Sequence, residues 1–138
     1  MSWRKIFRRT AILLTFMSFF ALSEAHAEIK IYEGVGEYLM TDETVNFAKE
    51  QAETLAQRDI LEKICVYVEE ESIMIDNELD KDEIITISAG ILYVIDTKFS
   101  MAEDDAGIIV KSFVTAQIDT DELKILLDKA VKERISDD

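Results

Sequence analysis

The stretch that decides the fold runs through residues 29–63: IKIYEGVGEYLM (29–40) followed by TDETVNFAKEQAETLAQRDILEK (41–63). The first part is rich in β-branched and aromatic residues and alternates with a period of two, which predicts a strand. Within this strand, Gly34 and Gly36 predict either a bulge or a close approach by the helix that packs on it.

The second part predicts a long amphipathic helix over about residues 42–63. Thr41-Asp42-Glu43 offers capping oxygens and acidic residues, which suit the positive end of a helix dipole. Apolar residues then recur at steps of three and four. They are Val45, Ala48, Ala52, Leu55 and Ala56, followed by Ile60 and Ile64. The small members of this stripe would let the helix lie close to a sheet.

The rest of the chain adds two capping patterns, Asp80-x-x-Glu83 and Asp119-x-x-Glu122. The elements expected after the long helix are a strand at 66–75, a helix at 81–88 ended by Gly90, hairpin strands at 91–101 and 108–118, and an amphipathic helix from 119 onward. The order is β-α-β-α-β-β-α. We therefore expect a two-layer α+β domain, with a largely antiparallel sheet packed by the long helix.

The N-terminal residues 1–27 have the composition of a signal peptide. Four basic residues precede an apolar run at 11–22, and Ala25-His26-Ala27 provides a cleavage site. The run is too short to span a bilayer, which takes about 20 residues. Cleavage would leave 28–138 as one exported domain in the periplasm or outside the cell. Since no cysteine stands where a lipid would be attached, we expect no membrane anchor after cleavage.

The charge of the mature chain argues against two classes of partner. The leader takes four of the 15 basic and one of the 29 acidic residues, so 11 Lys and Arg would face 28 Asp and Glu in the mature chain, a formal charge of −17. Such a surface repels nucleic acid and anionic lipid. The sequence does not predict the oligomeric state.

The single cysteine, Cys65, lies in the apolar context Ile64-Cys65-Val66. It is expected to be buried as a small hydrophobic residue. The alternative is a disulfide to another chain or a reactive thiol, because an unpaired cysteine is unusual in an exported protein.

Catalytic and cofactor sites are poorly supported. Without the leader the chain has no histidine, so a Ser-His or Cys-His dyad cannot form. Gly34-Val35-Gly36 lacks the third small residue of a dinucleotide fingerprint, because Leu39 stands there. We therefore assign no catalytic, cofactor or metal-binding residue and predict that the protein is not an enzyme. A small hydrolase using two carboxylates remains the alternative.

Acidic runs raise a second alternative, an exported calcium-binding protein. The run Asp76, Glu78, Asp80 and Asp82 begins like an EF-hand loop, but Lys81 and Ile87 replace the required Gly and Glu. An exposed turn followed by a helix cap explains it as well. The run Glu103-Asp104-Asp105 allows loose calcium binding in the same way. Glu69-Glu70-Glu71 is expected to be a solvated strand edge.

Aromatic residues alternate along the expected strands. They are Tyr32, Tyr38, Tyr67, Tyr93 and Phe99. Core and cross-strand packing explains such a pattern. An exposed aromatic stripe that forms a partner site is the alternative.

A distributed pattern over about residues 29–118 resembles a known family. The matching residues are Glu33-Gly34-Val35-Gly36, Ala52, Ala56, Arg58-Asp59, Val66-Tyr67-Val68-Glu69, Asn77, Leu79, Asp82, Ile84 and Ser88-Ala89-Gly90. They resemble the N-terminal domain of flagellar assembly protein T and the related small Lpp-type outer-membrane lipoproteins. The resemblance implies a cell-envelope domain that acts by protein–protein contact, linked to flagellar or outer-membrane assembly. Within this pattern, Asp59 lies near the apolar stripe and is expected to pair with an arginine as a helix–sheet clamp.

Overall fold

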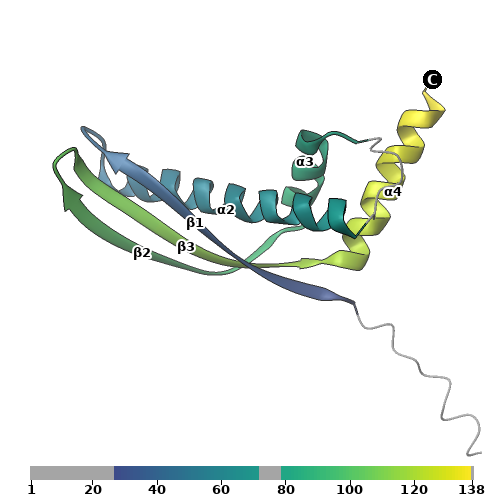
Figure 1. The fold of residues 1–138 in the computed structure, drawn as a ribbon, viewed down its shortest axis with the longest axis horizontal. Coiled ribbons are helices and arrows are strands. Elements are labelled where there is room, and N and C mark those ends of the chain that lie inside the picture. Colours follow the sequence, from purple (N-terminus) through teal and green to yellow (C-terminus); the bar gives the residue numbers. More distant parts are fainter. Residues whose placement is uncertain (1–26, 72–78, 138) are drawn as a thin grey trace, which may run out of the picture.

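Six elements are formed by residues 27–71 and 79–137, the ranges that the computed structural model describes (Figure 1). In chain order they are β1 (Ile29–Met40), α2 (Val45–Glu70), α3 (Lys81–Ile91), β2 (Tyr93–Asp104), β3 (Gly107–Asp119) and α4 (Thr120–Ser136). Residues 1–26 of the predicted signal peptide lie outside the described residues.

The strands form one antiparallel sheet in the order β1-β3-β2, so β3 is central and β1 and β2 are the edges. The predicted hairpin is confirmed as β2 and β3. At its turn, the Asp104 carboxylate accepts hydrogen bonds from the main-chain N–H of Ala106, at 2.8 Å, and of Gly107, at 3.2 Å. Gly107 has a φ of +144°, which residues with a side chain rarely adopt.

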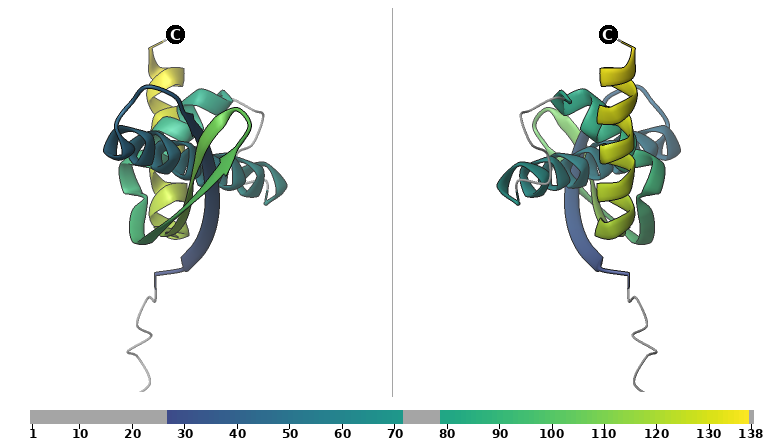
Figure 2. Two further views of the ribbon diagram at one scale, coloured as in Figure 1. Left: turned by 90° about the vertical axis from the view of Figure 1, so that its left-hand side faces the viewer. Right: turned by 90° about the vertical axis from the view of Figure 1, so that its right-hand side faces the viewer.

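The long helix α2 lies along one face of this sheet, over β1 and β3 (Figures 1 and 2). Two glycines of β1 make this possible. A Cβ atom at Gly34 would clash with the carbonyl oxygen of Ala56, and one at Gly36 would clash with that of Ala52. Both alanines are fully buried. The close approach predicted from the two glycines is confirmed, and it brings strand and helix backbones into contact.

The predicted strand at 66–75 is wrong, and so is the element order built on it. Residues 66–70 continue α2, 72–75 lie outside the described ranges, and the observed order is β-α-α-β-β-α. Val66 and Val68 favoured a strand by composition. However, Ile60, Ile64 and Val68 all lie on the buried side of α2. A helix that is already formed extends at little cost, so burial of this stripe decides against the local β preference.

The start of the long helix also differs from the prediction. It begins at Val45, where the Thr44 side chain caps it by accepting a hydrogen bond from the N–H of Phe47 at 3.3 Å. Glu43 instead accepts from the main-chain N–H of Thr41 and from the hydroxyl of Tyr38, both at 3.0 Å. The acidic residue thus fastens the β1–α2 turn rather than the helix.

Two capping predictions are confirmed at the shorter helices. Asp80 and Glu83 form the predicted capping box of α3, which runs past Gly90 to Ile91. Asp119 caps α4 by accepting from the N–H groups of the first turn.

The main core lies where α2, α3, α4 and the sheet meet, at the end of the molecule away from the β2–β3 turn (Figure 1). Its largest fully buried side chains are Ile60, Ile64, Val68, Val114, Ile118, Leu123 and Leu127. A smaller cluster of Ala48, Ala52 and Val110 continues under the N-terminal half of α2. Val45 and Leu55, which the helical pattern placed in the stripe, are 39% and 43% exposed. The stripe is therefore narrower at this end than predicted, because only alanines fit against the glycines.

Candidate interaction surface

Among the described residues, helices cover one face of the sheet and none covers the other. On β1 the side chains of Ile31, Val35 and Leu39 point away from α2 and are 62%, 44% and 43% exposed. Phe113 lies opposite Val35 on β3 and is 43% exposed. We call this surface the outer face, and its large apolar side chains include Ile29, Ile31, Val35, Leu39, Tyr93, Ile109 and Phe113. Large exposed side chains on one face are typical of contact sites.

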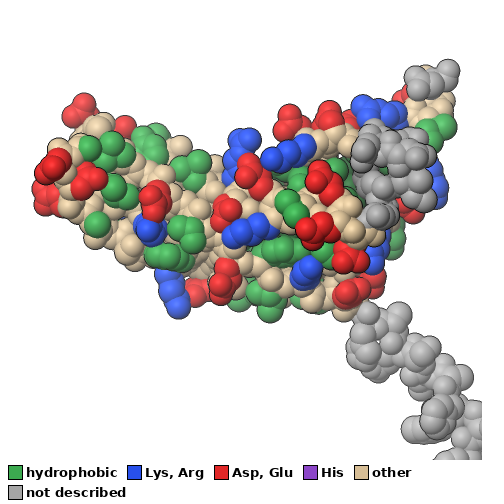
Figure 3. Space-filling model, viewed as in Figure 1, with side chains coloured by type: hydrophobic (Ala, Val, Ile, Leu, Met, Phe, Trp, Pro, Cys, Tyr) green, Lys and Arg blue, Asp and Glu red, His purple; other side chains and the backbone are tan. Residues whose placement is uncertain are grey.

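Charged residues separate the apolar positions of the outer face. Glu37 and Lys111 are register partners on β1 and β3, and they form an ion pair at 2.6 Å. On β2, Asp96 and Lys98 pair at 3.7 Å. Figure 3 shows hydrophobic side chains interspersed with charged ones in this way. It also shows carboxylates gathered at the end where the β1–α2 and β2–β3 turns lie.

The edge of the sheet formed by β1 is covered at its centre by two side chains of α2. The carboxylate of Asp59 accepts a hydrogen bond from the N–H of Val35 at 3.0 Å, and the ammonium of Lys63 donates to the carbonyl of Glu33 at 2.7 Å. Asp59 and Lys63 are themselves joined at 3.0 Å. Together they take the positions that a neighbouring strand would use. The expected clamp at Asp59 is confirmed, but its cation is a lysine; Arg58 contacts Glu62 instead.

The electrostatics of Asp59 fit this role. Partial burial alone would raise the pKa of Asp59. The hydrogen bond from Val35, the hydrogen bond from Lys63 and the positive charge of Lys63 together outweigh this effect, so the pKa lies below its usual value. Glu43 also has a lowered pKa, chiefly because main-chain N–H groups donate to it. Both carboxylates are stabilised as anions that hold structure together, which is the opposite of what a general acid requires.

The edge formed by β2 has no such cover from any described residue. In an antiparallel ladder the N–H and C=O of one residue point to the same side, and successive residues alternate. Because Val35 points its N–H to the β1 edge, the register of the three strands can be followed across to β2. The residues whose main-chain groups point outward there are Thr97, Phe99, Met101 and Glu103, and we call them the β2 edge. Among the described residues, no other element hydrogen-bonds to these main-chain groups.

The side chains of the β2 edge lie on the same side of the sheet as α2. Lys49 of α2 lies over the ring of Phe99, 5.3 Å from its centroid, and the hydroxyl of Thr97 donates to Glu53 of α2 at 3.4 Å. Phe99 is still 37% exposed, and Met101 is 51% exposed. The edge therefore combines unpaired main-chain groups with partly exposed apolar side chains.

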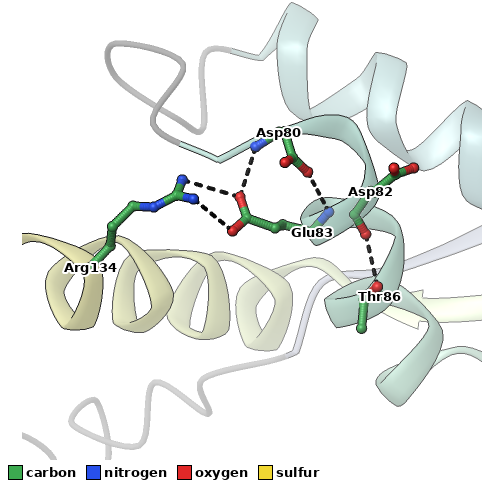
Figure 4. Close-up of polar contacts among 5 residues, drawn as sticks. All are labelled: Asp80, Asp82, Glu83, Thr86 and Arg134. Atoms are coloured by element: carbon green, nitrogen blue, oxygen red, sulfur yellow. Dashed lines mark hydrogen bonds and ion pairs between the residues drawn. The ribbon is translucent and has the colours of Figure 1, made fainter.

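The acidic positions around α3 form a structural link rather than a catalytic pair (Figure 4). The carboxylate of Glu83 accepts from the main-chain N–H of Asp80 at 2.9 Å and from both terminal nitrogens of Arg134, at 3.0 and 3.2 Å. Asp80 returns the capping bond to the N–H of Glu83 at 2.8 Å. Glu83 thereby ties α3 to α4, and both of its oxygens are already engaged.

A shallow cavity of about 390 Å³ lies beside this link, between α3 and α4. It is lined by Leu79, Asp80, Asp82, Glu83, Thr86, Ile87, Ala130, Glu133 and Arg134. The hydrolase alternative would need two carboxylates facing a substrate across such a cavity. Here the central carboxylate is held by a guanidinium, so the cavity does not favour that alternative.

The positions considered for calcium are described only in part. Asp76 and Glu78 lie outside the described residues, and Asp80 is used as a helix cap. Within 27–71 and 79–137, no three acidic, histidine or cysteine side chains are grouped to hold a metal ion. In the β2–β3 turn, Asp104 is occupied by main-chain N–H groups. Glu69 and Glu70 end α2 and are exposed, so the predicted strand edge there is wrong.

The buried position predicted for Cys65 is confirmed: the thiol is free, and the residue is 2% exposed. Its sulfur contacts the carbonyl oxygen of Lys81 at 3.8 Å, and burial raises its pKa. A buried neutral thiol is a poor nucleophile. This position fits a packing role and does not favour a disulfide to another chain.

Some of the aromatic residues pack in the core and others are exposed, so neither core packing nor an exposed partner site explains all of them. Tyr32, Tyr38 and Tyr67 are partly buried against the core clusters, and Tyr67 belongs to α2 rather than to a strand. Tyr93 and Phe99 are exposed on β2. Tyr93 lies on the outer face and Phe99 on the side of α2, so these two residues do not form one exposed aromatic stripe.

Sequence reasoning missed the role of Lys63 and the difference between the two sheet edges. The spacing of Asp59 and Lys63, four residues apart on a helix, was a signal for their ion pair. Nothing in the spacing indicates that the pair meets a strand edge.

Comparison with known proteins assigns no role to these features. The chain matches no protein-family model and has no significant match among curated proteins. In the parts of the chain described here, no helix is both long enough and apolar enough to cross a membrane.

Proposed function

We propose that the protein is an exported, non-enzymatic interaction module of the cell envelope that acts by protein–protein contact. The observation that carries this proposal is the outer face: α2 covers one face of the sheet, and apolar side chains are exposed on the other. A partner that covered Val35, Leu39 and Phe113 would remove this apolar surface from water. Burial of this kind is the main favourable term in protein association.

Export rests on the signal-like residues 1–27, and the contacts of Glu28 support it. The carbonyl of Glu28 accepts hydrogen bonds from the N–H and the hydroxyl of Thr120, both at 2.9 Å. Its N–H lies 3.4 Å from the carboxylate of Asp121. Among the described residues, the contacts that fasten β1 to α4 begin at Glu28, which follows the proposed cleavage site. From the resemblance of residues 29–118 to the N-terminal domain of flagellar assembly protein T, we infer that the module acts in flagellar or outer-membrane assembly.

Site-specific photocrosslinking in living cells tests this proposal. A photoreactive phenylalanine analogue replaces Phe113 on the outer face and, as the matched control, Ile125 on α4, which is 67% exposed. We expect a discrete adduct with an envelope protein from position 113 and none from position 125.

A substitution within the outer face completes the test. Val35→Lys places a charge beside Phe113 without disturbing the buried side of β1, so it should abolish the adduct while the protein keeps its melting temperature. Adducts of equal yield from 113 and 125, or an adduct that survives Val35→Lys, would contradict the proposal.

A further inference from the structure

We propose that the β2 edge binds an extended, basic segment of another protein, which pairs with β2 as a fourth strand of the sheet. The inference rests on the proposed function and assigns it a site and a class of partner. Addition of a strand to an exposed sheet edge is a recurrent mode of peptide recognition.

The first step is the contrast between the two edges of the sheet. Folded proteins usually blunt an exposed edge, because its unpaired N–H and C=O groups recruit other strands. Here Asp59 and Lys63 of α2 form hydrogen bonds to the main chain at the β1 edge. The β2 edge, from Thr97 to Glu103, keeps its main-chain groups unpaired by any described element. A fourth strand can therefore be added at β2, but not at the centre of β1 without displacing the clamp.

The second step concerns the length and shape of the open stretch. The β2–β3 ladder has one irregularity, between Val94 and Asp96, and is regular from Asp96 to the turn. A bulge strengthens the local twist and interrupts pairing. It thus confines the open stretch to the part of β2 that carries Phe99 and Met101, whose side chains give an incoming strand an apolar contact beside α2.

The third step is the charge of the partner. The carboxylates at or beside the edge are Glu53, Asp96, Glu103, Asp104 and Asp105, and the cations are Lys49 and Lys98. Asp96 and Lys98 pair with each other. The remaining excess of carboxylates favours a segment that alternates apolar residues with Lys or Arg.

The same charge argues against a second copy of this chain as the occupant. The full chain has a formal charge of −14, so two copies brought edge to edge repel each other. A basic segment of a different protein meets no such barrier.

Peptide binding to the purified protein tests the inference. The probe is a capped eight-residue peptide of alternating lysine and valine, and the charge control replaces each lysine by glutamate. A third peptide carries N-methyl groups on alternate amides, which removes its ability to pair as a strand. We expect saturable binding of the first peptide. The N-methylated peptide should bind about tenfold more weakly, because the loss of one hydrogen bond to the edge gives a factor of about this size. The glutamate peptide should also bind more weakly, because the carboxylates around the edge repel it.

Two proline variants locate the binding site. Met101→Pro removes an outward N–H of the β2 edge and leaves the β2–β3 ladder intact, which an edge strand tolerates. Ile31→Pro is the matched control, because it removes an outward N–H from the β1 edge. Binding should fall about tenfold for Met101→Pro and stay unchanged for Ile31→Pro.

The other outcomes overturn the inference in distinguishable ways. Equal binding of the N-methylated peptide excludes strand pairing. Binding that is lost in Val35→Lys but kept in Met101→Pro moves the contact to the outer face, so the proposed function survives and the inference fails. Dimerisation without peptide that Met101→Pro abolishes makes a second copy the occupant. No saturable binding of any peptide refutes the inference, and the photocrosslinking experiment then decides the proposed function by itself.

Discussion

Replacing Gly34 by alanine should destabilise the protein strongly, because β1 and α2 touch through their backbones at this position. The added Cβ would collide with the carbonyl oxygen of Ala56 and would lie 2.6 Å from Cγ1 of Ile60 and 3.2 Å from the carbonyl carbon of Ala56. A side chain can rotate away from such a contact, but a helix backbone cannot. The whole of α2 would therefore have to move away from the sheet.

Overpacking of this kind costs about 1–3 kcal/mol, and we expect the upper end because backbone atoms are involved. At about 4 °C per kcal/mol for a domain of this size, the melting temperature of Gly34→Ala should fall by about 8–12 °C. Thermal and urea unfolding followed by circular dichroism measure the change.

Gly90→Ala is the matched control, since it makes the same chemical change within α3. Nothing lies within 4 Å of a Cβ at this position. Alanine is favoured over glycine inside a helix by about 0.5–1 kcal/mol, so the melting temperature should rise by a few degrees. If Gly34→Ala melts within about 2 °C of the unmodified protein, the close packing of α2 on β1 is wrong.

Three further predictions test the clamp, the thiol and the new N-terminus. The lowered pKa of Asp59 means that its contribution to stability is present above the unfolded-state pKa, near 4, and is lost as pH falls through the lower native value. Thermal melts should therefore show Asp59→Asn less stable than the unmodified protein from pH 7 to about 5, with the gap closing below about pH 4; a gap that widens in acid contradicts this. Cys65 should resist a thiol reagent in the native state and react after unfolding in urea, and rapid native labelling would show that it is accessible. Mass spectrometry should find Glu28 at the N-terminus of the exported protein, where the new ammonium group pairs with Asp121. Asp121→Asn should then lower the melting temperature of the processed protein by a few degrees, and should lower that of the uncleaved chain by less.

Much of this fold could be predicted because its local signals agree with its packing. The capping residues Asp80 and Asp119 stand where their helices begin, and the polar turn around Gly107 separates two strands of 12 and 13 residues. At 66–70 the signals conflict: the composition is that of a strand, while the buried stripe of α2 extends through Val68. Such a conflict is resolved by tertiary contacts, which a single sequence does not show.

The candidate site was harder to predict than the fold because it depends on which strand becomes an edge and on what covers that edge. The sequence shows Asp59 and Lys63 as an ordinary ion pair on a helix surface. Only the placement of α2 over β1 brings them to the main chain of Glu33 and Val35. The same placement leaves β2 at the far edge of the sheet, where no comparable pair of α2 side chains reaches its main chain in the described structure. Lys49 and Glu53 of α2 contact the side chains of Phe99 and Thr97 instead. One long helix can cover only one edge of a three-stranded sheet in this way, so the position of α2 determines which edge is open to a partner.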